Sequence, residues 1–227
     1  MKHLSGRIAS ILVFLTLTVF AQNIAETNLR TLHLFRSHPH DPVAIVKLMR
    51  GAVEIQPDIP FEAGDDWLKE ISVVIRNIST SKITYISVAA HLPETGDGTK
   101  ESPRVGGGNA VGKKPEHAMY SALTGERRQE AAADPIDLEP GKDLAMPLIA
   151  ERDYTTVKSL IEATHALSTI RTCDVWVTTI FFDDGTKWAP TNYWRPQEAK
   201  PGAYISIPFE DWLQMQQAHQ VPQAQQR

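Results

Sequence analysis

The chain has 227 residues, of which 23 are basic and 27 acidic, and 42% are hydrophobic. Its net charge of −4 excludes binding of a phosphate backbone as the main role, because such proteins carry an excess of basic side chains. The hydrophobic share is that of a globular domain. The single cysteine, Cys173, excludes an intrachain disulfide and cysteine-based zinc or iron–sulfur sites.

Residues 1–21 have the composition of a secretory signal. Lys2 and Arg7 give a basic start, residues 8–20 are mostly apolar and uncharged, and Ala21 is a small residue at the expected cleavage point. An apolar helix of this length is too short to cross roughly 30 Å of hydrocarbon. The sequence therefore predicts an exported protein, periplasmic or extracellular, without permanent membrane insertion.

The first half of the mature chain predicts strands separated by irregular segments. Residues 22–42 show no sustained period and are predicted to be an irregular lead-in. The β-branched run 42–55 predicts an edge strand bent at Gly51. Residues 71–77 and 83–92 alternate apolar and polar side chains and are joined by a short polar link, which predicts an antiparallel hairpin. Residues 94–117, rich in glycine and proline, are predicted to be a long loop.

The second half predicts one helix and the longest strand. Apolar residues recur at helical spacing over 153–165, with Asp153 as the predicted N-cap. Residues 170–182 predict a central strand, because both of its faces are largely apolar. Asp184-Gly185 predicts a tight hairpin turn that returns through Trp188. Residues 196–227 predict a C-terminal extension that is partly disordered.

About seven strands with one additional amphipathic helix predict an all-β fold, an antiparallel sandwich over 43–195. Three segments resemble turns of immunoglobulin-like domains in bacterial exported proteins: Asn77-Ile78-Ser79, Leu138-Glu139-Pro140-Gly141 and the Asp184-Gly185 turn before Trp188. The chain is thus similar to an uncharacterised group of secreted bacterial proteins. This resemblance implies an immunoglobulin-like sandwich and no catalytic residues.

Trp188, Tyr193 and Trp194 form the candidate ligand-binding cluster. Exposed aromatic rings stack on sugar rings, so the three side chains are typical of a polysaccharide site. A sandwich core also buries tryptophan, and packing in the core is the alternative interpretation.

Three polar groups are candidate metal ligands. The irregular lead-in contains side chains of the kinds that can bind zinc or copper, namely His33, His38, His40 and Asp41. A solvated segment is favoured there, because no regular element fixes their geometry. Asp65-Asp66 and Asp183-Asp184 lie in predicted turns, and turn stabilisation is favoured over a calcium site. No metal or cofactor is therefore predicted.

No catalytic residue is predicted either. Residues 107–113 match most of the phosphate-binding loop motif, but Lys114 occupies the position at which that motif has Ser or Thr as a magnesium ligand. Cys173 lies in a predicted buried strand, and the sequence has no G-x-S-x-G motif.

The favoured function is thus an exported, non-enzymatic domain that binds a protein or surface partner in the cell envelope. The first alternative is a carbohydrate-binding module that uses Trp188, Tyr193 and Trp194 on a surface glycan. The second is an unrecognised hydrolase, because catalytic groups meet in space rather than in sequence. The identity of the partner and the oligomeric state stay open.

Overall fold

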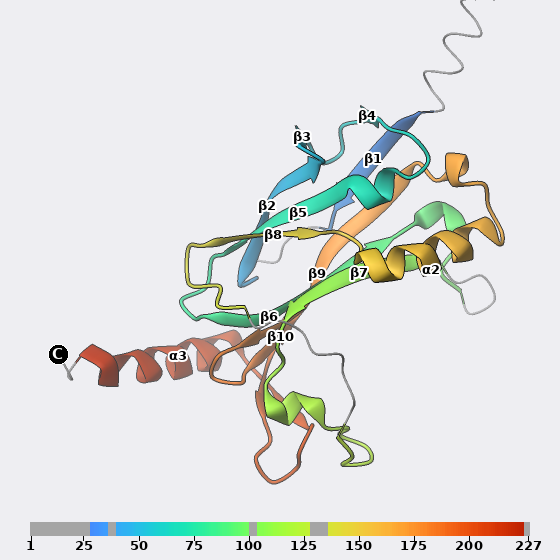
Figure 1. Ribbon diagram of the computed structural model, residues 1–227. Helices are drawn as coiled ribbons and strands as arrows, with labels where there is room; N and C mark the ends of the chain where they lie inside the picture. The colour runs from blue at the N-terminus through green and yellow to red at the C-terminus, as the bar shows by residue number, and fades with distance from the viewer. Residues whose placement is uncertain (1–27, 36–39, 100–103, 128–135, 225–227) are drawn as a thin grey trace, which may run out of the picture.

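The structure is a computed structural model that describes residues 28–35, 40–99, 104–127 and 136–224 (Figure 1). The predicted signal over 1–21 and His38 lie outside these residues. The described chain is mainly β and forms two sheets, one of eight strands and one of four.

The smaller sheet is antiparallel and has the order β3-β2-β5-β8. Its strands are β2 (Val43–Arg50), β3 (Val53–Ile55), β5 (Ile71–Asn77) and β8 (Asp143–Pro147). β2 and β3 form a hairpin around Gly51, whose φ of 55° suits a residue without a Cβ atom. The predicted bend at Gly51 is therefore a turn between two strands, and the edge of the sheet is β3.

The larger sheet is built around β9 (Thr172–Phe182), which pairs with β6 (Ile83–His91) along one edge. β7 (Gly106–Gly112) continues the sheet beyond β6. The other edge of β9 is shared by two strands: β1 (Leu29–Leu34) pairs with it in parallel and β10 (Lys187–Ala189) antiparallel. The sheet is completed by β4 (Phe61–Glu62) beside β1, and by β11 (Asn192–Pro196) and β12 (Tyr204–Ile207) beyond β10. The central position predicted for residues 170–182 is confirmed, because β9 pairs with other strands along both of its edges.

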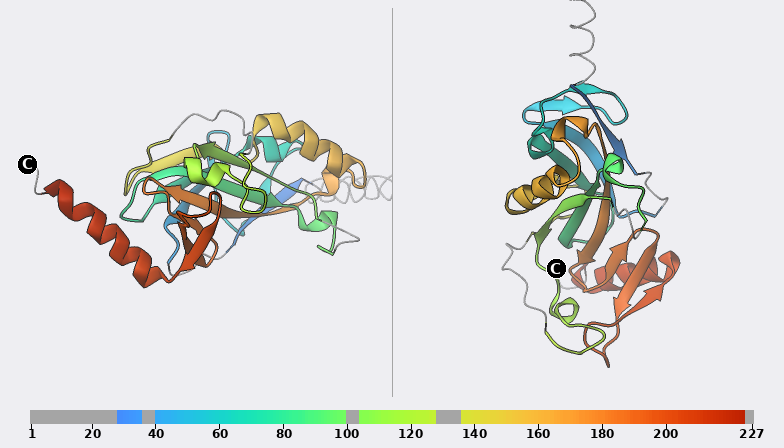
Figure 2. Two further views of the ribbon diagram at one scale, coloured as in Figure 1. Left: turned by 90° about the horizontal axis from the view of Figure 1, so that it is seen from below. Right: turned by 90° about the vertical axis from the view of Figure 1, so that its right-hand side faces the viewer.

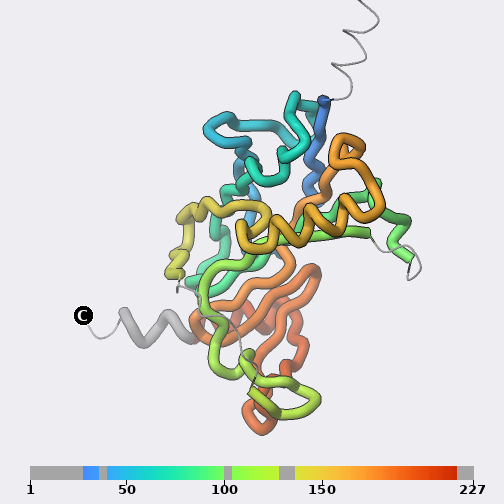
Figure 3. Tube along the Cα trace, turned by 45° about the vertical axis from the view of Figure 1, so that its right-hand side comes forward, coloured from blue at the N-terminus to red at the C-terminus, as the bar shows by residue number. Residues whose placement is uncertain are grey.

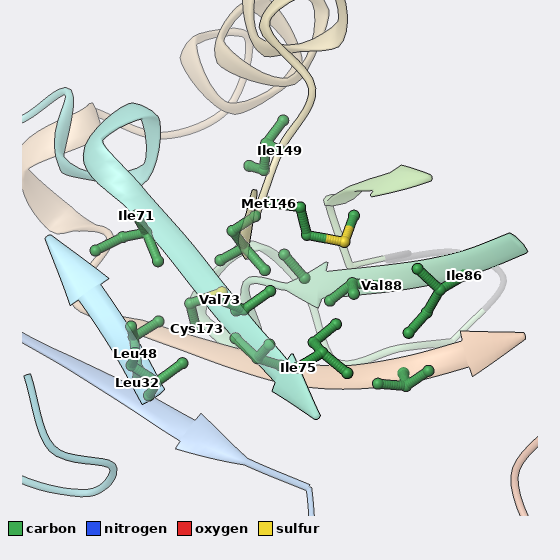
Figure 4. Close-up of a cluster of buried hydrophobic side chains, with 14 of the residues drawn as sticks. Leu32, Leu48, Ile71, Val73, Ile75, Ile86, Val88, Met146, Ile149 and Cys173 are labelled. Carbon is green, nitrogen blue, oxygen red and sulfur yellow. The ribbon is translucent and has the colours of Figure 1, made fainter. Parts of the chain in front are cut away.

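The core lies between the two sheets. In Figure 4, side chains of β2 and β5 point toward side chains of β6 and β9. Val73 and Ile75 of β5 have no exposed surface, and neither do Ile86 of β6 and Val175 of β9. Each such side chain contributes about 1.5–3 kcal/mol when it is fully buried. The apolar side chains of the alternating segments 71–77 and 83–92 thus fill the core.

A β-bulge changes which residues of β9 face the core. The register with β6 shifts so that Ser87 pairs with Thr179 and Val88 pairs with Val177, which leaves Thr178 as an extra residue. An extra residue reverses the alternation beyond it. Ile180 therefore follows Val177 onto the core face, and Phe181 turns to the opposite face. Strict alternation would place Phe181 on the same face as Val177, so it does not hold beyond the bulge.

Helix α2 (Glu151–Glu162) lies against β7, and it confirms the predicted amphipathic helix (Figure 1). Val157 and Ile161 are its buried residues. A Cβ atom on Gly107 would lie only 2.9 Å from Cγ2 of Val157, so glycine is what allows the close approach. The predicted N-cap was wrong: Ala150 holds that position and Asp153 lies in the first turn, where a negative charge suits the helix dipole.

Helix α3 (Phe209–Ala224) packs beside β10, β11 and β12 (Figure 2). Trp212 and Gln216 are one helical turn apart and are 2% and 4% exposed. The Gln216 amide donates to Asp184 over 2.6 Å, and Ser81 donates to the Gln216 carbonyl oxygen. The described part of the predicted C-terminal extension, residues 196–224, thus contains β12 and this docked helix.

Six further expectations need correction. Residues 71–77 and 83–91 do not form a hairpin, because β5 pairs with β2 and β8 while β6 pairs with β7 and β9. The irregular lead-in contains β1, and the long loop contains β7. The described residues hold twelve strands rather than about seven, and two α-helices rather than one. The parallel pairing of β1 makes the larger sheet mixed, not purely antiparallel.

Candidate binding groove

The edge of β9 that β1 and β10 share has a gap between them. β1 pairs with β9 up to Val175, and β10 pairs from Ile180 onward. Among the described residues, no strand pairs with residues 176–179 on this edge. The gap is about 13 Å long at 3.3 Å per residue. An interrupted strand edge of this kind exposes backbone groups that can pair with another chain.

A cavity of about 360 Å³ lies at this gap. Its walls come from both sheets: β9 and β10 contribute from the larger sheet, and the start of β2 contributes from the smaller one. Most of the lining is apolar, and Asp41 is its charged member. The lining residues are Leu34, Phe35, Asp41, Val43, Ala44, Ile45, Pro57, Trp176, Val177, Trp188 and Pro190.

Two further cavities share lining residues with the first one. A cavity of about 430 Å³ shares Asp41 and Trp188 with it and extends to Phe209 at the start of α3. A small cavity of about 80 Å³ shares Leu34, Ile45 and Pro57 with it and extends along β2 and β3. We call these three adjoining cavities the inter-sheet groove. Its volume lies within the range of natural ligand sites, roughly 300–1,000 Å³.

Two aromatic contacts shape the gap itself. The rings of Phe35 and Trp176 are 5.7 Å apart at an angle of 52°, and His91 meets Trp176 edge-on at 4.5 Å. Phe35 is 68% exposed, an unusual position for so large an apolar side chain. Partly exposed aromatic rings beside an apolar cavity are typical of a binding surface.

The polar groups of the groove gather around Asp41. The Tyr193 hydroxyl donates to the His40 carbonyl over 2.7 Å, and the His40 ring stacks on Phe209 at 4.1 Å. Burial, together with the negative charge of Asp41, raises the pKa of Tyr193. Asp41 lines both of the larger cavities, so it places a carboxylate where they adjoin.

The three aromatic residues predicted as a ligand-binding cluster do not share one surface. Trp188 and Tyr193 pair across β10 and β11, and each is 3% exposed. Trp194 pairs with Lys187, so it lies on the opposite face of the same sheet. Trp188 still lines both larger cavities with its remaining surface. Packing accounts for the first two aromatic residues, and the sugar-stacking cluster as predicted does not form.

The other candidates from the sequence have local partners. His33 Nδ1 lies 2.6 Å from a carboxylate oxygen of Asp58. The Asp184 carboxylate accepts hydrogen bonds from the Thr186 hydroxyl and from the Gln216 side-chain amide. In the part of the chain that is described, no three His, Cys, Asp or Glu side chains come together as metal ligands would. Cys173 is fully buried, and burial raises the pKa of its thiol. Residues 107–112 form part of β7, so they do not cradle a phosphate.

Sequence reasoning missed the residues that make the groove. Phe35, Trp176 and Pro57 carry no motif, and they come from segments far apart in the chain. Asp41 was considered only as a metal ligand. The one available signal was the cluster of Trp176 and Trp188 on strands predicted to be neighbours.

No helix of the described chain is both long and apolar enough to span a bilayer. Comparisons with protein-family models, with curated proteins and with solved structures found no match.

Proposed function

We propose that this chain is an exported, immunoglobulin-like sandwich protein that binds a protein partner in the cell envelope through the inter-sheet groove. The signal-like composition of residues 1–21 supports export. Two stacked sheets, with the chain crossing from one to the other between β5 and β6, support the immunoglobulin-like assignment.

The observation that carries the binding proposal is the mostly apolar cavity at the interrupted edge of β9, which shares lining residues with two further cavities. A groove that runs from the β2–β3 hairpin to α3 suits an extended chain better than a compact molecule. Such a chain adds backbone hydrogen bonds at the edge of β9 and places side chains in the cavities. The carboxylate of Asp41 favours a segment with one basic residue among apolar ones.

The test is selection of random peptides displayed on phage against the mature protein, followed by affinity measurements with purified peptides. We expect the enriched peptides to be apolar with one Lys or Arg. Ala44 lines the central cavity, so Ala44→Trp fills it and should weaken peptide binding about tenfold or more, which is ~1.4 kcal/mol. Asp41→Asn should lower the preference for the basic residue.

The matched control is Ala145→Trp, which makes the same change at an exposed position of β8 outside the groove. Circular dichroism must show that both variants fold. Peptides that bind the two variants equally well would place their site elsewhere. Enrichment of no peptide, with 1-anilinonaphthalene-8-sulfonate bound to wild type and excluded by Ala44→Trp, would identify a site for small apolar molecules instead.

A further inference from the structure

A row of side chains crosses the larger sheet on the face opposite Trp188 and Tyr193. Tyr85 of β6 lies opposite Phe181 of β9, Phe181 lies opposite Lys187 of β10, and Lys187 lies opposite Trp194 of β11. Directly paired residues project to the same face of a sheet. The row therefore brings three aromatic rings and a lysine from four strands onto one face, and of these side chains Phe181 is buried.

The neighbouring row faces the other way. Ile86, Ile180, Trp188 and Tyr193 pair across the same four strands one residue out of phase, and all four are buried. Because the sheet separates the two rows, the row with Lys187 is distinct from the inter-sheet groove.

The segment after β7 adds to this face beside the β10–β12 strands (Figure 3). Nζ of Lys114 lies 5.1 Å from the centre of the Tyr85 ring. The His117 ring meets Tyr204 edge-on at 5.1 Å, and its Nε2 lies 2.7 Å from the Ala203 carbonyl oxygen. We call the set Tyr85, Lys114, Lys187, Trp194 and Tyr204 the aromatic–lysine face; each of its members is partly exposed.

Lys187 is the central charge of the aromatic–lysine face. Its Nζ lies 5.1 Å from the Trp194 ring and 5.9 Å from the Tyr204 ring, which are cation–π distances. It forms no ion pair with a carboxylate among the residues that the structure describes. Burial and, second, the positive charge of Lys114 lower the pKa of Lys187. A negative group bound here would therefore offset both the desolvation of this cation and its repulsion from the second one.

Tyr204 supplies an unused polar group on the same face. Its hydroxyl is buried and has no hydrogen-bond partner within the described residues. Burial raises the pKa of Tyr204 to about 12, so the hydroxyl keeps its proton at neutral pH and is a donor. A ligand oxygen that accepted from this hydroxyl would satisfy it once the hydroxyl is uncovered.

We propose that the aromatic–lysine face binds an acidic glycan, a sugar chain that carries carboxylate or sulfate groups. Partly exposed rings of Tyr85 and Trp194 offer surfaces for the C–H face of a sugar, while Lys187 pairs with its anionic group and Lys114 adds positive charge beside it. A bare anion would use the lysines alone and leave the rings unused. Because the chain as a whole is negatively charged, the positive charge of this face is local and selects against unspecific binding of polyanions.

The experiment is calorimetric titration of the mature protein with three probes: an oligogalacturonide, a heparin oligosaccharide and a neutral malto-oligosaccharide. We expect one of the two charged probes to bind, with an affinity that falls as salt is added. Lys187→Gln keeps the length of the side chain and removes its charge. This variant should weaken binding about tenfold, or ~1.4 kcal/mol. Lys114→Gln should weaken it in the same direction.

Lys142→Gln is the matched control, since Lys142 is an exposed lysine in the turn before β8. It should leave the affinity unchanged, and so should the groove variant Ala44→Trp, which separates this proposal from the one above. Failure of both charged probes to bind would overturn the proposal. So would binding that Lys187→Gln leaves intact, or a neutral probe that binds as well as the charged ones. Inorganic sulfate that binds as tightly as the heparin oligosaccharide would overturn the role of the sugar.

Discussion

At the scale of single residues, Asn77 shows how one side chain joins the two sheets. It is fully buried at the end of β5, and its amide donates to the carbonyls of Ser81 and Leu138, each over 2.8 Å. Its carbonyl oxygen accepts from the amide and the hydroxyl of Ser79. These bonds hold the turn that carries the chain from β5 in one sheet to β6 in the other.

We therefore predict that Asn77→Ala destabilises the protein strongly. The change removes two buried hydrogen bonds, so that the Leu138 carbonyl keeps only the Ile83 backbone donor and the Ser81 carbonyl only the Ser79 hydroxyl. Each lost bond costs about 0.5–1.5 kcal/mol. Urea unfolding followed by circular dichroism measures the loss. The neighbouring Ile78→Ala is the control, because Ile78 is 56% exposed and surface changes are usually within about 0.5 kcal/mol. Similar midpoints for the two variants would show that the turn does not depend on Asn77.

The candidate aromatic residues show what sequence can decide at this scale. Period-two alternation correctly places Trp188 and its neighbour Lys187 on opposite faces of the sheet. It does not predict which of the two faces is covered by other parts of the chain. Trp188 and Tyr193 are buried because α3 and the start of β2 lie against them, and no local pattern predicts either contact. The bulge at Thr178 is likewise invisible in the sequence, and it moves Phe181 to the face that carries Lys187.

At the scale of elements, Asp66 attaches α2 to the 3₁₀ turn that precedes β5. One of its carboxylate oxygens accepts from Lys158 over 2.9 Å and from the Tyr154 hydroxyl over 2.8 Å. These two hydrogen bonds, that from Lys158 first, lower the pKa of Asp66. The folded state thus favours the ionised form of this side chain more than the unfolded state does.

The sign of the pH dependence follows from this lowered pKa. The contribution of Asp66 is complete above the unfolded value of about 3.9 and is lost as pH falls through the lower folded value. We predict that Asp66→Asn reduces the melting temperature at pH 7 and flattens its decline below about pH 4. Thermal melts between pH 2 and pH 7 test this. Glu139→Gln, the loss of an equal charge in an exposed turn, should keep the wild-type profile. An unchanged slope in Asp66→Asn would contradict the assignment.

The elements that sequence predicted well are those whose own residues carry the pattern. Helix α2 and strands β5, β6 and β9 agree with their predicted ranges to within a few residues. β7 was missed because its glycines have no hydrophobic period. It can pair closely with β6 because Gly108 and Gly112 lack Cβ atoms, which would collide with carbonyl oxygens of β6. β1 was missed because it pairs with residues more than a hundred positions away. α3 was missed because its burial depends on Ser81 and on aromatic residues of β9 and β11. The local pattern therefore predicts that a segment is a strand, but not which other strand it pairs with.

At the scale of the whole molecule, one core extends from the sheet interface to the C-terminal helix. The buried apolar cluster includes Leu32 of β1, Ile75 of β5, Trp188 of β10 and Trp212 of α3. The Trp212 ring stacks on Tyr193 at 4.3 Å and contacts Phe182, the last residue of β9, at 5.2 Å. Helix α3 is therefore packed on the central strand itself, and its loss affects both sheets.

We predict that Trp212→Ala lowers the stability of the whole fold and not only of the β10–β12 strands. Removing this side chain, 2% exposed, should cost about 3–5 kcal/mol through lost burial and the cavity left behind. Because the core is shared, circular dichroism and the fluorescence of the four remaining tryptophans should shift to the same lower midpoint. Leu160→Ala, at a half-exposed position of α2, should move the midpoint little. If fluorescence shifted while the circular dichroism transition stayed in place, the strands after β9 and α3 would unfold as a unit of their own, and the single core would have to be divided in two.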